Sequence, residues 1–79
     1  MAGFDEIVAA SRASETCILT YSKQDGSIVT HEIFGYSLRN GDLMAWRIDL
    51  GKIRRFKIDG ILAVEGTGNH FDPEYPMEL

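Results

Sequence analysis

The sequence predicts a mainly β fold: one short N-terminal helix followed by five short strands that form a small, strongly bent antiparallel barrel. The apolar residues change from a helical spacing to a period of two at about residue 16. Two tight-turn signals, Asp25-Gly26 and Asn40-Gly41, separate strand-like segments. Because a helix is expected only at the start, helices cannot cover a parallel sheet, and doubly wound folds are excluded.

The first expected element is an amphipathic helix over residues 4–13. Phe4, Ile7, Val8 and Ser11 follow the i, i+3, i+4, i+7 spacing that places side chains on one helix face. Two acidic residues in the first turn complement the helix dipole. A helix of about ten residues is marginal on its own, so we expect it to dock against the strands.

The strands follow in order, each bounded by turn residues. They are expected over residues 17–22, 28–34 continued by 36–39 after a bend or bulge at Gly35, 43–49, 53–58 and 61–65. The remaining tail contains Pro73 and Pro76, and we expect it to be irregular or partly disordered. The chain is thus divided into a helix and linker (1–15), a barrel (16–66) and a C-terminal tail (67–79).

The hairpin around Gly51 decides which side chains face inward. A two-residue loop would mix apolar and charged side chains on both faces, which the pleat disfavours. A three-residue loop, Leu50-Gly51-Lys52, instead places Trp46 opposite Phe56 and Met44 opposite Ile58, so we expect this loop. The apolar set would then face the core. The outward row would hold Arg47, Arg55 and Lys57, with Arg54 on the other face.

Charge is distributed unevenly along the chain. The net charge is −4, yet residues 47–57 contain five basic residues and only Asp49 as an acid, so this segment carries +4 and the remainder −8. An acidic protein with one basic stripe is not a general duplex binder. The stripe could hold one phosphate or a short single strand. The alternative is a solvated strand edge, where Lys and Arg discourage pairing with other chains.

No arrangement of residues typical of catalysis is present. His31 and His70 lie in no metal-binding spacing, and Cys17 is the only cysteine, which excludes a disulfide framework and a cysteine-based zinc site. We therefore expect no enzyme, no cofactor and no metal. The start of the sequence lacks a signal-peptide pattern, and no apolar run is long enough to span a membrane. A cytoplasmic protein without a membrane partner is expected.

The basic stripe is the best candidate for a binding site. Arginine forks bind phosphate and carboxylate groups through two hydrogen bonds, and an aromatic side chain nearby can stack a base. Trp46 and Phe56 are expected in the core, whereas Tyr36 is a candidate for stacking. The candidate ligand-binding residues are Arg54, Lys57, Arg55, Arg47 and Tyr36.

Several segments together resemble a known family. They are residues 34–42, residues 51–61 with the run Arg54-Arg55-Phe56-Lys57-Ile58-Asp59, residues 18–21 followed by Asp25-Gly26, and Phe71-Asp72-Pro73. Their order resembles the WYL domain, a small Sm-like (Src-homology-3-like) β-barrel of bacterial transcription regulators. The resemblance implies a regulatory site for nucleic acid or a nucleotide-like effector, with Arg54 and Lys57 at matching positions.

The sequence departs from the WYL pattern at three places. Leu43-Met44-Ala45 replaces the name-giving tripeptide, Gly60 replaces the last arginine of the signature, and Lys57 stands where arginine is usual. The tripeptide positions and Gly60 cannot inherit the binding role. The predicted function is a non-enzymatic binding module for an anionic ligand, either single-stranded nucleic acid or a nucleotide-like effector. The alternative is a protein-interaction or self-assembly module, a homo-oligomer or part of a larger regulatory complex, because small barrels have open strand edges that can pair with a partner.

Overall fold

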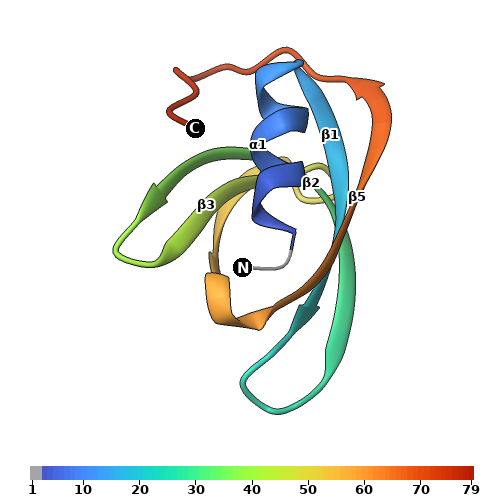
Figure 1. Cartoon of the computed structure of the whole chain (residues 1–79), viewed down its shortest axis with the longest axis vertical. Coiled ribbons are helices and arrows are strands. Elements are labelled where there is room, and N and C mark those ends of the chain that lie inside the picture. The colour runs from blue at the N-terminus through green and yellow to red at the C-terminus, as the bar shows by residue number, and fades with distance from the viewer. Residues whose placement is uncertain (1–2) are drawn as a thin grey trace.

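The computed structural model describes residues 3–79 and has a mainly β architecture (Figure 1). A single antiparallel sheet has the strand order β4-β3-β2-β1-β5, and one short helix precedes it. The elements are α1 (Phe4–Arg12), β1 (Glu15–Ser22), β2 (Ile28–Arg39), β3 (Asp42–Arg47), β4 (Lys52–Lys57), the 3₁₀ turn η1 (Ile58–Gly60) and β5 (Ile61–His70). The predicted helix and five antiparallel strands are therefore confirmed.

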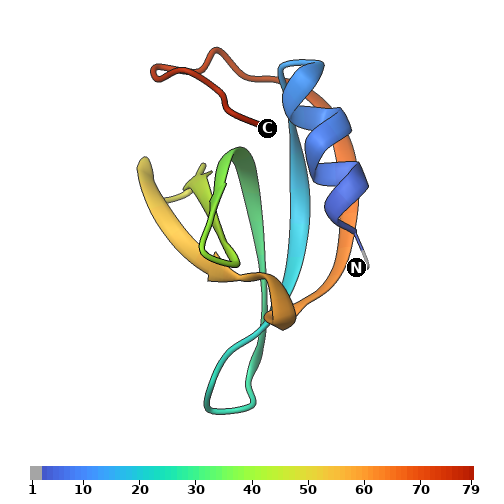
Figure 2. The same ribbon diagram turned by 60° about the vertical axis from the view of Figure 1, so that its left-hand side comes forward.

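Helix α1 packs against the sheet, where it contacts β1, β2 and β5 (Figure 2). Ile7 and Ser11 of the predicted apolar face are buried, and Phe4 packs against the core. The Ser11 hydroxyl donates a hydrogen bond of 2.8 Å to the Gly35 carbonyl oxygen in β2. A Cβ at Gly35 would lie 2.7 Å from Ile7 Cγ2, so glycine at this position permits the close approach of helix and sheet.

The β3–β4 hairpin differs from the expected pairing. Trp46 pairs with Ile53 and Leu43 pairs with Phe56, so residues 48–51 form a four-residue loop and the predicted three-residue loop is wrong. Gly51 has a φ of 65°, and its N–H donates a 2.9 Å hydrogen bond to the Arg47 carbonyl oxygen. The left-handed backbone at Gly51 closes the turn before Lys52, which therefore begins the next strand.

The four-residue loop changes which side chains face the core. Leu43 and Ala45 are fully buried, whereas Trp46, expected in the core, is only half-buried. Phe56 is buried as expected. The basic residues are redistributed too, because strand neighbours alternate in direction: Arg47 and Arg54 lie on one face of the hairpin, and Arg55 and Lys57 on the other. The predicted common outward row of Arg47, Arg55 and Lys57 is therefore wrong.

The sheet curls so that the end of β4 approaches β1. The backbone N–H of Lys57 donates a hydrogen bond of 2.8 Å to the Tyr21 hydroxyl. The Tyr21 ring meets Phe56 edge to face, with ring centroids 5.2 Å apart. These contacts join the last residues of β4 to β1, although the two strands are not neighbours in the sheet.

The C-terminal segment is irregular, as predicted, but it packs against the sheet. Strand β5 continues to His70, beyond the expected boundary at residue 66. The N–H of Phe71 then donates to the Ser14 carbonyl oxygen at 2.8 Å, and the N–H of Glu78 donates to the Tyr36 carbonyl oxygen at 2.7 Å. The last residue, Leu79, packs against the hydrophobic core.

Candidate anion-binding cleft

A cleft of about 240 Å³ lies on the face of the sheet that carries Arg47 and Arg54. Strands β1 to β4 and the start of the β1–β2 turn contribute its walls. The residues that line it are Tyr21, Lys23, Val29, His31, Arg47, Arg54, Arg55 and Phe56. The cleft thus combines four cationic side chains with two aromatic rings and an imidazole, and none of its lining residues carries a carboxylate.

Two of the four cations have carboxylate partners beside the cleft. Arg47 forms a two-pronged ion pair with Asp49, with nitrogen–oxygen distances of 2.6 and 3.1 Å. Arg55 pairs more loosely with Asp42 at 3.6 Å. Within residues 3–79, Arg54 has no ion-pair partner, and its side chain is exposed. Arg54 is therefore the arginine whose guanidinium is most available to an incoming anion.

His31 lies in the cleft among these positive charges. Partial burial lowers its pKa below the ordinary histidine value, and the nearby Arg47 and Lys23 lower it further, while Asp49 acts in the opposite direction. The imidazole is therefore neutral at pH 7. Its ring is tilted against Phe56, with centroids 6.1 Å apart. A bound anion would reverse the balance of charge around His31 and favour its protonated form.

Lys57 lies outside this cleft but lines a neighbouring one of about 430 Å³. The two clefts share Tyr21, Lys23 and Arg55. The second cleft also contains Asp25, whose carboxylate accepts hydrogen bonds from the N–H and hydroxyl of Ser27. Of the predicted residues, the structure thus gathers Arg47, Arg54 and Arg55 in one cleft and places Lys57 in the next.

Tyr36 is not part of this site. The residue is 3% exposed, and its hydroxyl accepts a hydrogen bond of 3.0 Å from the N–H of Glu74. Its ring contacts Phe34 and Tyr75, so the C-terminal segment covers it. In this structure Tyr36 cannot stack a base. The rings of Tyr21 and Phe56 both line the cleft, but Phe56 is only 5% exposed, so Tyr21 supplies most of its aromatic surface.

Sequence reasoning missed five of the eight residues that line the cleft. The sequence pattern assigns Tyr21, Val29 and His31 to strands, Phe56 to the core and Lys23 to a turn, and none of them to a binding site. Tyr21 and Val29 pair across β1 and β2, as do Leu19 and His31, which places all four near the same end of the hairpin. The period-two pattern around the Asp25-Gly26 turn is enough to predict the β1–β2 register. The curl of the sheet, which brings β4 close to these residues, depends on contacts between residues that are distant in sequence.

Cys17 is unsuited to nucleophilic chemistry. The residue is 1% exposed, and burial, with a contribution from the Glu32 carboxylate, raises the pKa of its thiol to about 11. The thiol is therefore protonated at neutral pH and packs as a small apolar group. Within residues 3–79, no group of three His, Cys, Asp or Glu side chains is arranged to hold a metal ion.

No protein-family model matches the chain, and a search of curated proteins finds no significant match. Among the described residues, no helix has the length and apolar character needed to cross a membrane.

Proposed function

We propose that this chain is a non-enzymatic binding module for an anionic ligand that carries a base, either a nucleotide-like effector or single-stranded nucleic acid. The observation that carries this proposal is the cleft itself. Three arginines and a lysine line a concave surface beside two aromatic rings, and no carboxylate lines it. Arginine supplies paired N–H donors that match phosphate oxygens, and the half-buried Tyr21 ring offers a surface on which a base can stack.

Each part of the cleft has a distinct role in this proposal. Arg54, free of an ion pair within residues 3–79, would contact a phosphate directly. Arg47 is held in place by Asp49 and contributes positive potential. At about 240 Å³ the cleft is smaller than most pockets for whole ligands, so it fits one phosphate or one base. Arg55 and Lys23 continue into the neighbouring cleft, where Lys57 would meet the next phosphate.

An Sm-like, WYL-like barrel is the fold that we propose for this function. The helix followed by five antiparallel strands supports it, as does the curl that brings Lys57 to Tyr21. The departures from the WYL pattern have structural counterparts. Leu43 and Ala45 fill the core, and a Cβ at Gly60 would lie 2.7 Å from the Tyr21 ring, which leaves no room for the arginine of the signature.

The proposal is tested by fluorescence anisotropy with a labelled short oligothymidine, at low and high salt. Arg54→Glu should weaken binding about tenfold or more, a loss of about 1.4 kcal/mol. Lys52→Glu is the matched control, because it makes the same change of charge two residues away on β4 but lines neither cleft. Its effect should be at most about twofold, and affinity for the wild type should fall steeply with salt.

Competition by adenosine monophosphate separates the two ligand types. Full displacement of the oligothymidine by the mononucleotide indicates a nucleotide-like effector, whereas weak displacement indicates a strand that spans both clefts. Absence of binding at low salt would contradict the proposal, as would equal effects of Arg54→Glu and Lys52→Glu.

A further inference from the structure

A second surface, on the other face of the β3–β4 hairpin, is covered by the chain's own C-terminal segment. This aromatic groove consists of Phe34, Tyr36, Met44, Trp46 and Ile53, which belong to β2, β3 and β4. Residues 71–79 lie across it without regular secondary structure. The segment lies on one side of the sheet and returns toward helix α1, as Figure 2 shows. The groove is therefore separate from the cationic cleft.

Aromatic contacts dominate the attachment of the segment. Phe71 stacks on Phe34, with ring centroids 4.6 Å apart and an interplanar angle of 29°. Tyr75 meets Tyr36 edge to face at 5.9 Å. Trp46 lies against both segment rings, at 6.3 Å from Phe71 and 6.5 Å from Tyr75. Two aromatic side chains, four residues apart in a segment that bends at residues 74–75, thus fit the groove.

The backbone of the segment is held at only a few points. The N–H of Glu74 donates to the Tyr36 hydroxyl, and that of Glu78 to the Tyr36 carbonyl oxygen. Pro73 and Pro76 have no N–H to donate, and they restrict φ on either side of a bend at residues 74–75. The segment is thus bound as a bent, proline-containing peptide in an aromatic groove, and not as a strand added to the sheet.

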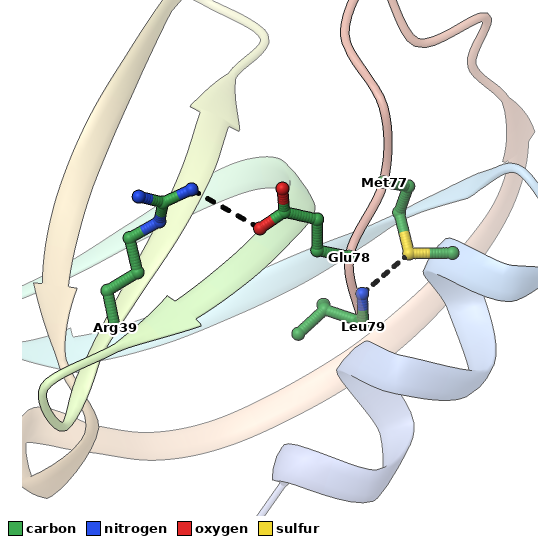
Figure 3. A network of polar contacts seen from close by, with 4 residues as sticks. All are labelled: Arg39, Met77, Glu78 and Leu79. Carbon is green, nitrogen blue, oxygen red and sulfur yellow. Dashed lines mark hydrogen bonds and ion pairs between the residues drawn. The ribbon is translucent and has the colours of Figure 1, made fainter.

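Polar contacts add charge complementarity at the far end of the segment. Arg39 forms an ion pair of 3.3 Å with Glu78, and the Leu79 N–H lies 3.0 Å from the Met77 sulfur (Figure 3). Both side chains of the ion pair are more than half exposed, so the pair contributes little to stability. The ion pair instead orients the segment, because it holds the acidic Glu78 beside the basic Arg39 at the edge of the groove.

The segment does not fill the groove. A space of about 280 Å³ remains between Tyr36, Met44 and Ile53 on the sheet and Tyr75 and Pro76 on the segment. A bound chain with larger apolar side chains would bury more of these surfaces than residues 71–79 do. The groove therefore has room for side-chain atoms beyond those of residues 71–79.

We infer that the aromatic groove is a docking site for an acidic partner peptide with two aromatic residues and interspersed prolines around a bend, the chemistry of residues 71–79. The chain's own C-terminal segment occupies the groove in cis and competes with the partner. Because it is tethered, its effective concentration is about millimolar, so a partner peptide must bind more tightly or arrive after the segment is released. This inference is independent of the proposed anion-binding function.

The test uses the full chain and a fluorescein-labelled peptide with the sequence of residues 69–79. Tyr75→Ala removes one aromatic contact of the cis segment, so this variant should bind the peptide at least tenfold more tightly than the wild type. Leu62→Ala, an exposed position on β5, is the control and should behave as the wild type. Addition of an unlabelled peptide should change the emission of Trp46, the only tryptophan.

Three outcomes would overturn the inference. The first is that the wild type and Tyr75→Ala bind the labelled peptide with equal affinity. The second is that a peptide in which both aromatic residues are replaced by alanine binds as tightly as the original peptide. The third is that Tyr75→Ala forms a concentration-dependent dimer in size-exclusion chromatography. The dimer would assign the groove to the segment of a second copy instead of a partner. If Tyr75→Ala loses its circular dichroism spectrum, Phe71→Ala serves as the second variant, with the same expected gain in peptide affinity.

Discussion

Replacement of Gly60 by alanine tests how the curl of the sheet is maintained. Gly60 ends the 3₁₀ turn between β4 and β5. A Cβ there would lie 2.7 Å from Cε1 and 3.0 Å from Cζ of the Tyr21 ring, and 2.9 Å from the Ser22 carbonyl oxygen. The Ser22 oxygen belongs to the backbone of β1 and cannot rotate away. The Tyr21 ring must therefore move, and with it the hydroxyl that accepts the Lys57 N–H.

The expected loss of stability combines three effects. Overpacking of this kind costs about 1–3 kcal/mol. Loss of the hydrogen bond between Lys57 N–H and the Tyr21 hydroxyl costs about 1 kcal/mol. Alanine restricts the unfolded chain more than glycine does, which offsets about 0.5 kcal/mol. The free energy of unfolding of Gly60→Ala should therefore fall by about 1.5–3.5 kcal/mol relative to the wild type.

Urea denaturation followed by circular dichroism measures this difference. The control is Gly66→Ala in β5, because a Cβ at Gly66 meets no atom within 4 Å. Its stability should change by less than about 0.5 kcal/mol. The midpoint of Gly60→Ala should decrease with an unchanged denaturant slope, which indicates lost stability without a change in the unfolded state. Equal stability of the two variants would refute the role assigned to Tyr21 and the close contact at Gly60.

Three further predictions concern single side chains. Burial raises the pKa of the Cys17 thiol from 9.0 to about 11, so the thiol ionises at lower pH in the unfolded chain than in the folded one. The free energy of unfolding should therefore fall above pH 9, by about 2 kcal/mol at pH 11. In urea titrations, Cys17→Ala should lack this pH-dependent loss. The pKa of His31 is lowered in the free protein, and a bound anion would raise it, so His31 takes up a proton when the anion binds. The affinity for oligothymidine should therefore increase as the pH falls from 7.5 to 5.5. His31→Gln should abolish that dependence, and an unchanged dependence would place the ligand elsewhere. Ser11→Ala removes the buried hydrogen bond to the Gly35 carbonyl and should lower the free energy of unfolding by about 1–2 kcal/mol, whereas no loss would show that the carbonyl finds another partner.

The sequence was sufficient to predict the elements of the fold because each has a local signal. The helix follows from the spacing of Phe4, Ile7 and Ser11, and Asp25-Gly26 and Asn40-Gly41 mark two of the turns. The β3–β4 register could not be predicted in the same way. It depends on the left-handed backbone at Gly51 and on the burial of Leu43, both of which are settled by the folded chain.

The candidate site was predicted only in part for a related reason. A run of basic residues in sequence places Arg54 and Arg55 on opposite faces of a strand, yet both line the cleft at the edge of the curled sheet. The curl also brings Tyr21 and His31 to them from other strands. Tyr36 was assigned to the site by its nearness to the stripe in sequence, but the C-terminal segment covers it, and no local pattern indicates that contact.

The most direct test of the cationic cleft is an NMR titration of the ¹⁵N-labelled full chain with adenosine monophosphate. Saturable chemical-shift changes should be concentrated at the residues that line the cleft, among them Tyr21, Lys23, His31 and Arg54. They should shrink together as salt is added. Shift changes that are absent, that do not saturate, or that are confined to helix α1 and the C-terminal segment would contradict the assignment of this cleft as the anion site.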